Sequence, residues 1–402
     1  MTARTAQQPQ RMASPKPTDL DVHGLRASEF PWALTGDATF LNAASTGPLP
    51  HRCIEAVTEW TRLRATPQKL SDEKLFATLA RSRELVARLI GASPAEIALA
   101  VNTSYGINVA ALGLPLEPGD VVITPDLEFP ANIYPWWAAA NARQLEYRRI
   151  PLSDGVLELD DLLRAMDDHR VKCVSVSWLD SGNGARVDLD RIGNACRERG
   201  IFFVVDAIQG VGAVPLDLHQ LHVDILACGA QKWLLSPWGA GFVYVRDDLV
   251  RRLDPPIVSW MAPKGTDDFR RLRDYDMTWR DDARRFEFIT LPFHDFAGMN
   301  ASLELFFELG PDNVANHIEG LVNDIVEWTR DRRTVKLVTP SAPERRGGIA
   351  CIRPPDGEKA SARLKKRGIV HSLREGNIRL SPHMYNTRAD VQAALEALDS
   401  SS

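Results

Sequence analysis

Short apolar runs recur along most of the chain and alternate with amphipathic stretches. Runs of this length that are rich in β-branched or aromatic residues are typical of strands buried in a parallel sheet, because they are too short for helices. They predict strands at residues 97–101, 120–124, 145–149, 171–177, 201–205 and 223–227. A further run at residues 242–245 predicts an antiparallel strand that closes the sheet.

Apolar positions at helical spacing predict the helices between these strands, at residues 51–63, 71–90, 105–114, 189–199 and 246–253. Two long helical patterns follow, at residues 291–310 and 312–332, and then a mixture of short strands and helices that is typical of a small α+β domain. The strands of that mixture are predicted at residues 335–338, 348–352 and 369–372, and its helices at 358–367 and 388–398.

The pattern divides the chain into three parts. Residues 1–22 are rich in Gln, Pro, Ser and Thr and hold little that could form a core, so we expect a disordered tail. We expect a large α/β domain over residues 23–282 and a small C-terminal domain over residues 283–402. The stretch from 255 to 282 is rich in charge, Pro and Trp without a sustained period, which indicates a long surface segment between the two domains.

Composition narrows the function classes. The chain has 402 residues, 44% hydrophobic and 25% charged, which is typical of a globular protein. No apolar run reaches the length of a membrane span, and a net charge of −5 gives no general attraction to nucleic acid or anionic lipid. Five scattered cysteines without a CxxC pair argue against disulfides and a metal site, so we expect a cytoplasmic protein that binds a small molecule.

Two polar residues stand where buried strands end. Asp206 follows the strand at residues 201–205, and Lys232 lies among apolar residues shortly after the strand at 223–227. Ligands bind at the carboxyl ends of parallel strands. An amine and an acid at that edge suit pyridoxal phosphate (PLP), since the amine can form an imine with its aldehyde and the acid can keep the ring nitrogen protonated. The alternative is a buried structural ion pair.

The same window carries a family resemblance. The segments DAIQGVGAVPLDL, QKWL and GAGFVYV, all within residues 201–245, resemble the fold-type I PLP enzymes of the aminotransferase class V group. That group includes cysteine desulfurases, isopenicillin-N-epimerase-like proteins, transaminases and lyases. The resemblance implies a large domain with a mainly parallel seven-stranded sheet. It also implies that Lys232 is the lysine that holds the cofactor, that Asp206 faces the pyridine nitrogen, that Gln209 contacts the ring hydroxyl and that Gln231 contacts the phosphate.

Further cofactor contacts follow from the resemblance. Thr103 and Ser104 open a helix, whose free amides and positive dipole end can hold a phosphate. Phe129 corresponds to the aromatic residue that stacks on the ring, although an aromatic residue there can also be an ordinary core residue. Ser181 falls near the position that contacts the ring hydroxyl. Thr290, in the segment RRFEFIT, corresponds to a threonine that reaches the phosphate of the neighbouring subunit, and Ile289 stands before it where glycine is usual.

The substrate side of the site follows in the same way. The segment NIRLSPHMYN resembles the family's carboxylate-binding segment, in which Arg379 would clamp the substrate carboxylate through two parallel hydrogen bonds. The turn-rich segment FLNAASTGPLP resembles a loop that approaches the substrate, which makes Asn42 a candidate substrate contact. Because family sites are shared across a subunit interface, we expect a homodimer.

The reaction is less defined than the cofactor. We favour an aminotransferase that acts on an amino acid or a similar substrate. An epimerase of the isopenicillin N type and a C–S or β-eliminating lyase remain alternatives, because they use the same lysine, aspartate and arginine. A cysteine desulfurase is disfavoured, since residues 371–377 read HSLREGN and lack the nucleophilic cysteine. A non-catalytic binding protein and a nicotinamide dehydrogenase are weaker rivals; the latter lacks the glycine fingerprint.

Overall fold

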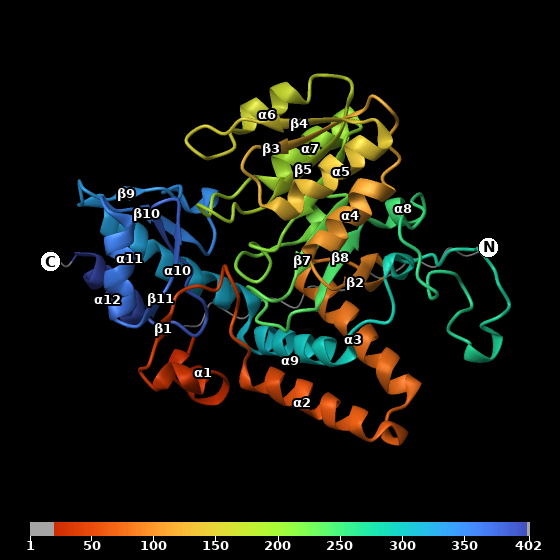
Figure 1. Ribbon diagram of the computed structural model, residues 1–402, viewed down its shortest axis with the longest axis horizontal. Coiled ribbons are helices and arrows are strands. Elements are labelled where there is room, and N and C mark those ends of the chain that lie inside the picture. Colours follow the sequence, from red (N-terminus) through yellow and green to blue (C-terminus); the bar gives the residue numbers. More distant parts are fainter. Residues whose placement is uncertain (1–19, 400–402) are drawn as a thin grey trace, which may run out of the picture.

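A computed structural model describes residues 20–399, so most of the predicted N-terminal tail lies outside the described residues. A seven-stranded sheet forms the centre of the larger part of the molecule, in the order β2-β8-β7-β6-β5-β3-β4 (Figure 1). Its strands are β2 (Ile97–Ala100), β3 (Val121–Pro125), β4 (Glu146–Ile150), β5 (Val171–Ser177), β6 (Phe202–Asp206), β7 (Ile225–Gly229) and β8 (Gly241–Val245). Only β8 runs antiparallel to its neighbours, which confirms the predicted mainly parallel sheet.

One strand begins two residues later than the pattern predicts. β7 starts at Ile225, directly after Asp224. The carboxylate of Asp224 accepts a hydrogen bond from the amide of Phe203 and forms an ion pair with Arg246, and these contacts set the start of the strand. The strand therefore ends at Gly229, only three positions before Lys232.

Helices cover both faces of this sheet, as the alternating pattern predicts (Figure 1). They are α3 (Asp72–Ile90), α4 (Thr103–Gly113), α5 (Tyr134–Arg143), α6 (Leu159–Ala165) and α7 (Leu189–Arg199), while α2 (His51–Ala65) lies farther from the sheet (Figure 1). α4 begins earlier than predicted, because the side chain of Asn102 caps it by accepting a hydrogen bond from the Tyr105 amide. The helix expected at residues 246–253 is reduced to the single turn α8 (Asp247–Val250).

A smaller unit follows two long helices, α9 (Phe293–Leu309) and α10 (Pro311–Arg330). Its four-stranded antiparallel sheet has the order β12-β13-β10-β9, with helices α11 (Gly357–Lys366) and α12 (Arg388–Asp399) packed beside it. The strands are β9 (Lys336–Leu337), β10 (Ala350–Arg353), β12 (Ser372–Arg374) and β13 (Asn377–Leu380). Figure 1 shows this unit in blue beside the carboxyl ends of the large sheet, where a site can be shared between both.

The N-terminal segment ties the two units together. α1 (Val22–Glu29) leads to β1 (Thr39–Phe40), which pairs in parallel with β11 (Ile369–Val370) of the smaller unit. The chain then continues through residues 41–50 to α2 on the large unit, and α9 packs along α2 and α3. None of the described helices is both long and apolar enough to cross a bilayer.

Candidate active site

The charges of Lys232 and Asp206 act on each other, although the two side chains do not form an ion pair within residues 20–399. Burial lowers the pKa of the Lys232 amine to about 8, while the charge of Asp206 acts in the opposite direction. Burial likewise raises the pKa of Asp206 to about 6, and the charge of Lys232 lowers it. In the described part of the chain no ion pair joins the two groups. The structural ion pair that the sequence left open is therefore absent, and an intervening group can lie between amine and acid.

The backbone around Lys232 is held by the loop that contains Asn42. The amide of Gly47 donates to the carbonyl oxygen of Gln231 over 2.8 Å. A β-carbon on Gly47 would lie 2.1 Å from the carbonyl oxygen of Lys232, so only glycine allows this approach. The loop that contains Asn42, the predicted substrate loop, therefore packs directly on the backbone of Lys232.

Asp206 ends β6 in the interior and is only 2% exposed. One carboxylate oxygen accepts a hydrogen bond from the amide of Ile208 over 3.0 Å. No other hydrogen bond to this carboxylate occurs within residues 20–399. Burial makes the ionised form of a carboxylate with one such hydrogen bond unfavourable, and this raises the pKa of Asp206. A protonated ring nitrogen would give the carboxylate a second, charge-assisted hydrogen bond.

Phe129 lies opposite Lys232, as a stacking residue would. The amine of Lys232 is 5.4 Å from the centroid of the Phe129 ring, and the ring is 42% exposed. Phe129 is therefore a wall of the cavity and not a core residue, which rules out the alternative that the sequence left open.

The N-terminus of α4 supplies the expected amides beside this cavity. The side chain of Asn102 accepts a hydrogen bond from the amide of Tyr105. The amides of Thr103 and Ser104 belong to the first turn of the helix, where amides have no partner within the helix. The hydroxyl of Thr103 accepts a hydrogen bond from the amide of Gly229 over 2.9 Å, which fixes the helix to the end of β7. Ser104 is exposed. The arrangement fits a phosphate, while a phosphate contact for each of these residues and for Gln231 stays a prediction.

Gln209 is more deeply engaged in the core than the sequence predicts. Its amide nitrogen donates to the carbonyl oxygen of Ala44 over 3.1 Å, and its amide oxygen accepts from the indole of Trp233 over 2.8 Å. It therefore links the substrate loop to the residue that follows Lys232. Its contact with the ring hydroxyl stays a prediction.

Arg379 is buried at the junction of the two units, with 1% of the residue exposed. One terminal nitrogen donates to the carbonyl oxygen of Ser181 over 2.5 Å, and the other donates to the hydroxyls of Ser45 and Ser372 over 2.7 and 3.3 Å. The Nε atom is buried without a hydrogen-bond partner. Burial lowers the pKa of the guanidinium to about 10, which still leaves it charged at neutral pH. An anion is the partner that this group lacks.

Asn42 holds this arginine indirectly. Its side-chain oxygen accepts from the hydroxyls of Ser45 and Ser372 over 2.9 and 3.0 Å. Asn42 therefore orients the two serines that contact Arg379, and a direct contact with substrate stays a prediction. Ser181 takes part through its backbone carbonyl, and its predicted contact with the ring hydroxyl is likewise untested.

Thr290 lies away from these residues. It is exposed and directly precedes the segment that leads into α9. Glu287, three positions before it, is buried and forms two hydrogen bonds with Arg83, at 2.7 and 2.6 Å. This segment is thus anchored firmly while Thr290 faces outward, as its predicted role at a neighbouring subunit requires.

Glu128 is a site residue that the sequence analysis missed. Its carboxylate accepts hydrogen bonds from the amide of Ser177, over 2.6 Å, and from the hydroxyl of the same residue. Burial raises the pKa of Glu128 to about 8, with smaller contributions from Asp206 and Asp180. The sequence signal that could have identified Glu128 is its position directly before Phe129, in a loop that follows a buried strand.

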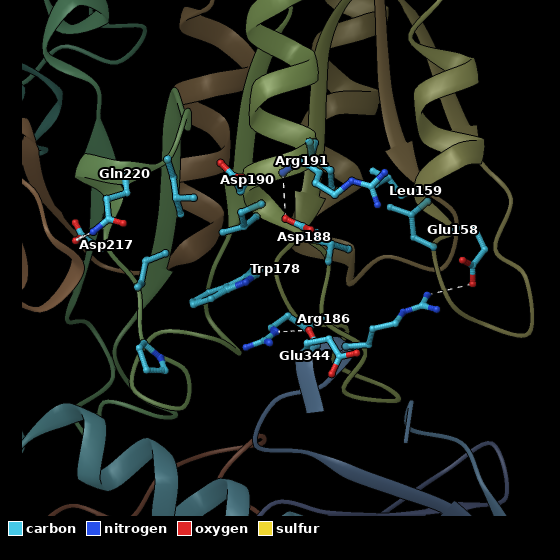
Figure 2. A pocket seen from close by; sticks show the side chains of 18 of the residues that line it. Glu158, Leu159, Trp178, Arg186, Asp188, Asp190, Arg191, Asp217, Gln220 and Glu344 are labelled. Carbon is cyan, nitrogen blue, oxygen red and sulfur yellow. Dashed lines mark hydrogen bonds and ion pairs between the residues drawn. The ribbon is translucent and has the colours of Figure 1, made fainter. Parts of the chain in front are cut away.

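A cavity of 970 Å³ between the two units adjoins the site, because Glu128, Phe129 and Ser181 line it together with Arg353 and Arg374. A second cavity, of 680 Å³, lies beside α7 (Figure 2). Its wall contains Trp178, the Arg345–Glu158 ion pair and a hydrogen bond from Arg186 to the carbonyl of Glu344. It includes none of the predicted site residues. No group of three or more metal-binding side chains occurs among residues 20–399.

Comparison with known proteins places the chain in a family. The family model described as aminotransferase class V matches residues 39–394. An isopenicillin N epimerase from Streptomyces clavuligerus is 30% identical, with 89% of this chain and 94% of the relative covered. An uncharacterized aminotransferase, YcbU, from Bacillus subtilis is 29% identical (79% and 82% covered), and a probable cysteine desulfurase from Aeropyrum pernix is 28% identical (92% and 96%).

Solved structures share the fold. An apo cysteine desulfurase from Thermococcus onnurineus superposes with a TM-score of 0.82 at 23% identity, covering 97% of this chain and 98% of the other. A mutant of C-DES with glycine covalently linked to its PLP cofactor gives 0.84 at 22% identity, covering 93% and 99%. These findings confirm the predicted fold and the PLP dependence of the family, and the buried amine of Lys232 near the buried acid of Asp206 fits that cofactor. This chain belongs to the aminotransferase class V family of PLP-dependent enzymes.

Proposed function

We propose that this protein is an aminotransferase that acts at the α-carbon of an amino acid. The observation that carries the proposal is the buried guanidinium of Arg379, with its unpartnered Nε, which lies close enough to Lys232 for its charge to lower the pKa of the amine. A carboxylate is the planar anion that an arginine binds through two hydrogen bonds. Arg379 thereby fixes the α-carboxylate and orients the α-carbon toward the amine of Lys232.

The residues around the cofactor divide the chemistry among them. When bound, PLP supplies an electron-withdrawing ring that weakens the bonds at the α-carbon. Lys232 holds the cofactor covalently and, once released, takes the α-proton on its Nζ atom. An amine with a pKa of about 8 is suited to that exchange near neutral pH, because both of its protonation states are populated. Asp206, ionised above a pH of about 6, accepts the N–H of the ring.

The cysteines support neither a desulfurase nor a disulfide-bonded protein. All five are free thiols buried in the interior. Cys351 lines the cavity, but burial raises its pKa to about 12, so it is a thiol and not a reactive thiolate. The unpaired thiols also support our proposal of a cytoplasmic location.

Epimerisation is the second candidate, and Glu128 is the observation in its favour. An epimerase needs a second group that can deliver a proton to the opposite face of the α-carbon. Glu128 lines the cavity beside Phe129, whose ring lies near the amine of Lys232, and a carboxyl with a pKa of about 8 holds a proton at neutral pH. A β-eliminating lyase uses the same lysine and remains the third candidate.

We also propose a homodimer. Large apolar side chains are exposed on the described surface, including Trp238 (76%), Phe288 (52%) and Met277 (71%). Exposed apolar residues of this size are typical of interfaces. Phe288 lies two positions before Thr290, which supports the proposal that this segment meets the neighbouring subunit.

One experiment separates the reactions. The purified protein, loaded with PLP, is mixed with a panel of amino acids in D₂O without an amino acceptor. Conversion of the cofactor to the pyridoxamine form with release of a keto acid supports the aminotransferase. If deuterium enters the α-carbon with loss of stereochemistry and no keto acid is released from the amino acid, epimerisation replaces the proposed aminotransferase activity. Release of ammonia and pyruvate from a β-substituted amino acid replaces it by elimination.

A further inference from the structure

The small sheet carries two rows of side chains toward the cavity. Ser372, Arg379 and Cys351 are direct partners on β12, β13 and β10. The hydroxyl of Ser372 accepts a hydrogen bond from Arg379, the proposed carboxylate clamp, and donates one to Asn42, while Cys351 lines the cavity. Because side chains two positions apart in a strand point to the same face, the next row in this direction faces the same cavity.

The next row consists mainly of cations. Arg374 pairs with Asn377 across β12 and β13, and the registers of β10 with its two neighbours bring Arg353 and Lys336 onto the same line. All four residues line the cavity of 970 Å³. Two residues along a strand correspond to about 7 Å, which is the spacing between this cationic row and the row of Arg379.

The cations of this row are not neutralised by the protein. The side chain of Asn377 accepts a hydrogen bond from Nε of Arg353 over 2.7 Å, which orients that guanidinium. Within residues 20–399, no ion pair involves Arg353, Arg374 or Lys336. Glu375 and Asp154 also line the cavity without pairing with the row. The charge of Arg374 is close enough to lower the pKa of both Lys232 and Arg379.

The acids on the opposite wall have partners of their own. Glu128 is bound to Ser177. Asp180 accepts from the amides of Gly182 and Asn183, at 2.9 and 2.7 Å. Neither acid is therefore available to close onto the cationic row, and the row is left to bind an anion from solution.

We propose that the row formed by Arg374, Asn377, Arg353 and Lys336 binds a second anionic group at the far end of the substrate side chain. The inference rests on the proposed function, because it assumes that Arg379 holds the α-carboxylate. The substrate class is an amino acid with a terminal carboxylate, sulfonate or phosphate, long enough to reach from one row to the other. Arg374 and Arg353 are then the residues that determine specificity.

The test compares charged and neutral side chains of matched length. L-Aspartate, L-glutamate and L-2-aminoadipate are titrated against L-asparagine, L-glutamine and L-norleucine, with the absorbance of bound cofactor as the signal. At least one acid should bind about tenfold more tightly than its neutral counterpart, the ratio expected for one charge-assisted contact. In the double variant Arg353→Gln/Arg374→Gln this ratio should fall to about one. Lys366→Gln, an exposed cation on α11 outside the cavity, is the matched control and should keep the ratio.

A second readout does not depend on amino-acid chemistry. Calorimetry on the cofactor-loaded protein compares glutarate with butyrate, which differ by one carboxylate. The row predicts tighter binding of glutarate, and equal binding in the double variant. If amino acids convert the cofactor but every acid binds like its neutral counterpart and glutarate like butyrate, the row is refuted and the proposed function stands. If no amino acid converts the cofactor while glutarate keeps its advantage, the proposed function fails and the anion site stands.

Discussion

The amine of Lys232 lies 5.4 Å from the centre of the Phe129 ring and close enough to Asp206 for each charge to shift the pKa of the other group, without an ion pair between them in the described residues. A flat cofactor can therefore be covered by the aromatic ring, attached at the amine and contacted by the acid at the same time. The predictions below follow from this arrangement and from the network around Arg379.

Removing the aromatic wall should weaken cofactor binding. Phe129→Ala loses the offset stacking, worth about 1 kcal/mol, so the dissociation constant for PLP should rise about fivefold, as measured by fluorescence titration of the apoprotein. Trp137→Ala, at an exposed position on α5, is the control. Unchanged PLP affinity in Phe129→Ala would show that the ring does not contact the cofactor.

The charge of Asp206 should be detectable in the titration of Lys232. Asp206 raises the pKa of the lysine, so Asp206→Asn should lower it, and Arg374→Gln should raise it because that cation lowers it. The pH dependence of amine labelling in the apoprotein, followed by peptide mapping, gives the midpoint directly. Asp248→Asn, on the exposed start of α8, should leave the midpoint unchanged. A midpoint that moves upward in Asp206→Asn would contradict the interaction between the Asp206 carboxylate and the Lys232 amine.

Asp206 should also cost stability in the apoprotein. Its pKa in the folded protein, about 6, lies above the usual value of 3.8, so the folded state binds the proton more tightly. The stability of the wild-type apoprotein relative to Asp206→Asn should therefore be highest near pH 4 and fall by about 3 kcal/mol as the pH rises through 6. Urea denaturation across this range measures the difference, and a wild type that gains relative stability with rising pH would refute the assignment.

The network behind Arg379 should affect substrate affinity and not cofactor binding. Arg379→Ala should retain the absorbance of bound cofactor and lose about a hundredfold in affinity for carboxylated amines, since a charge-assisted double contact is removed. Ser45→Ala/Ser372→Ala leaves the guanidinium in place but less oriented, so an intermediate loss is expected. If Arg379→Ala and wild type bind amino acids equally, the clamp lies elsewhere.

The close approach of the substrate loop to Lys232 predicts a strong effect of a small change. In Gly47→Ala the added methyl group would meet the Lys232 carbonyl oxygen at 2.1 Å, so the loop must move. Turnover should fall and the melting temperature should drop. In Gly113→Ala, at the end of α4, the nearest atoms lie at 3.4 Å, an ordinary contact, and little change is expected. A Gly47→Ala protein with full turnover would show that the loop does not position the lysine.

Local patterns were sufficient for the strands and for the two residues at their ends. Apolar runs located the sheet, and the unusual positions of Lys232 and Asp206 pointed to the PLP cofactor of the family, while the roles of the two residues stay predictions. The start of β7 was misplaced because the side chain of Asp224 bonds to a strand that lies elsewhere in the sequence. Tertiary partners of this kind leave no local signal.

The same reason explains what was missed in the site. Ser45 and Ser372 are separated by more than three hundred residues, yet both bind Arg379, and only the fold brings them together. Asn42 was predicted as a substrate contact, which stays a prediction, and its bonds to these serines were not foreseen. The cationic row depends on the register of four strands, which short alternating segments do not specify.

The most direct test of the account is reduction of the purified, PLP-loaded protein with borohydride, followed by peptide mapping of the reduced cofactor. The account predicts a visible absorbance band that disappears on reduction, with the label on Lys232 alone and no band in Lys232→Ala. A protein without a reducible band, or a label on another lysine, would contradict it.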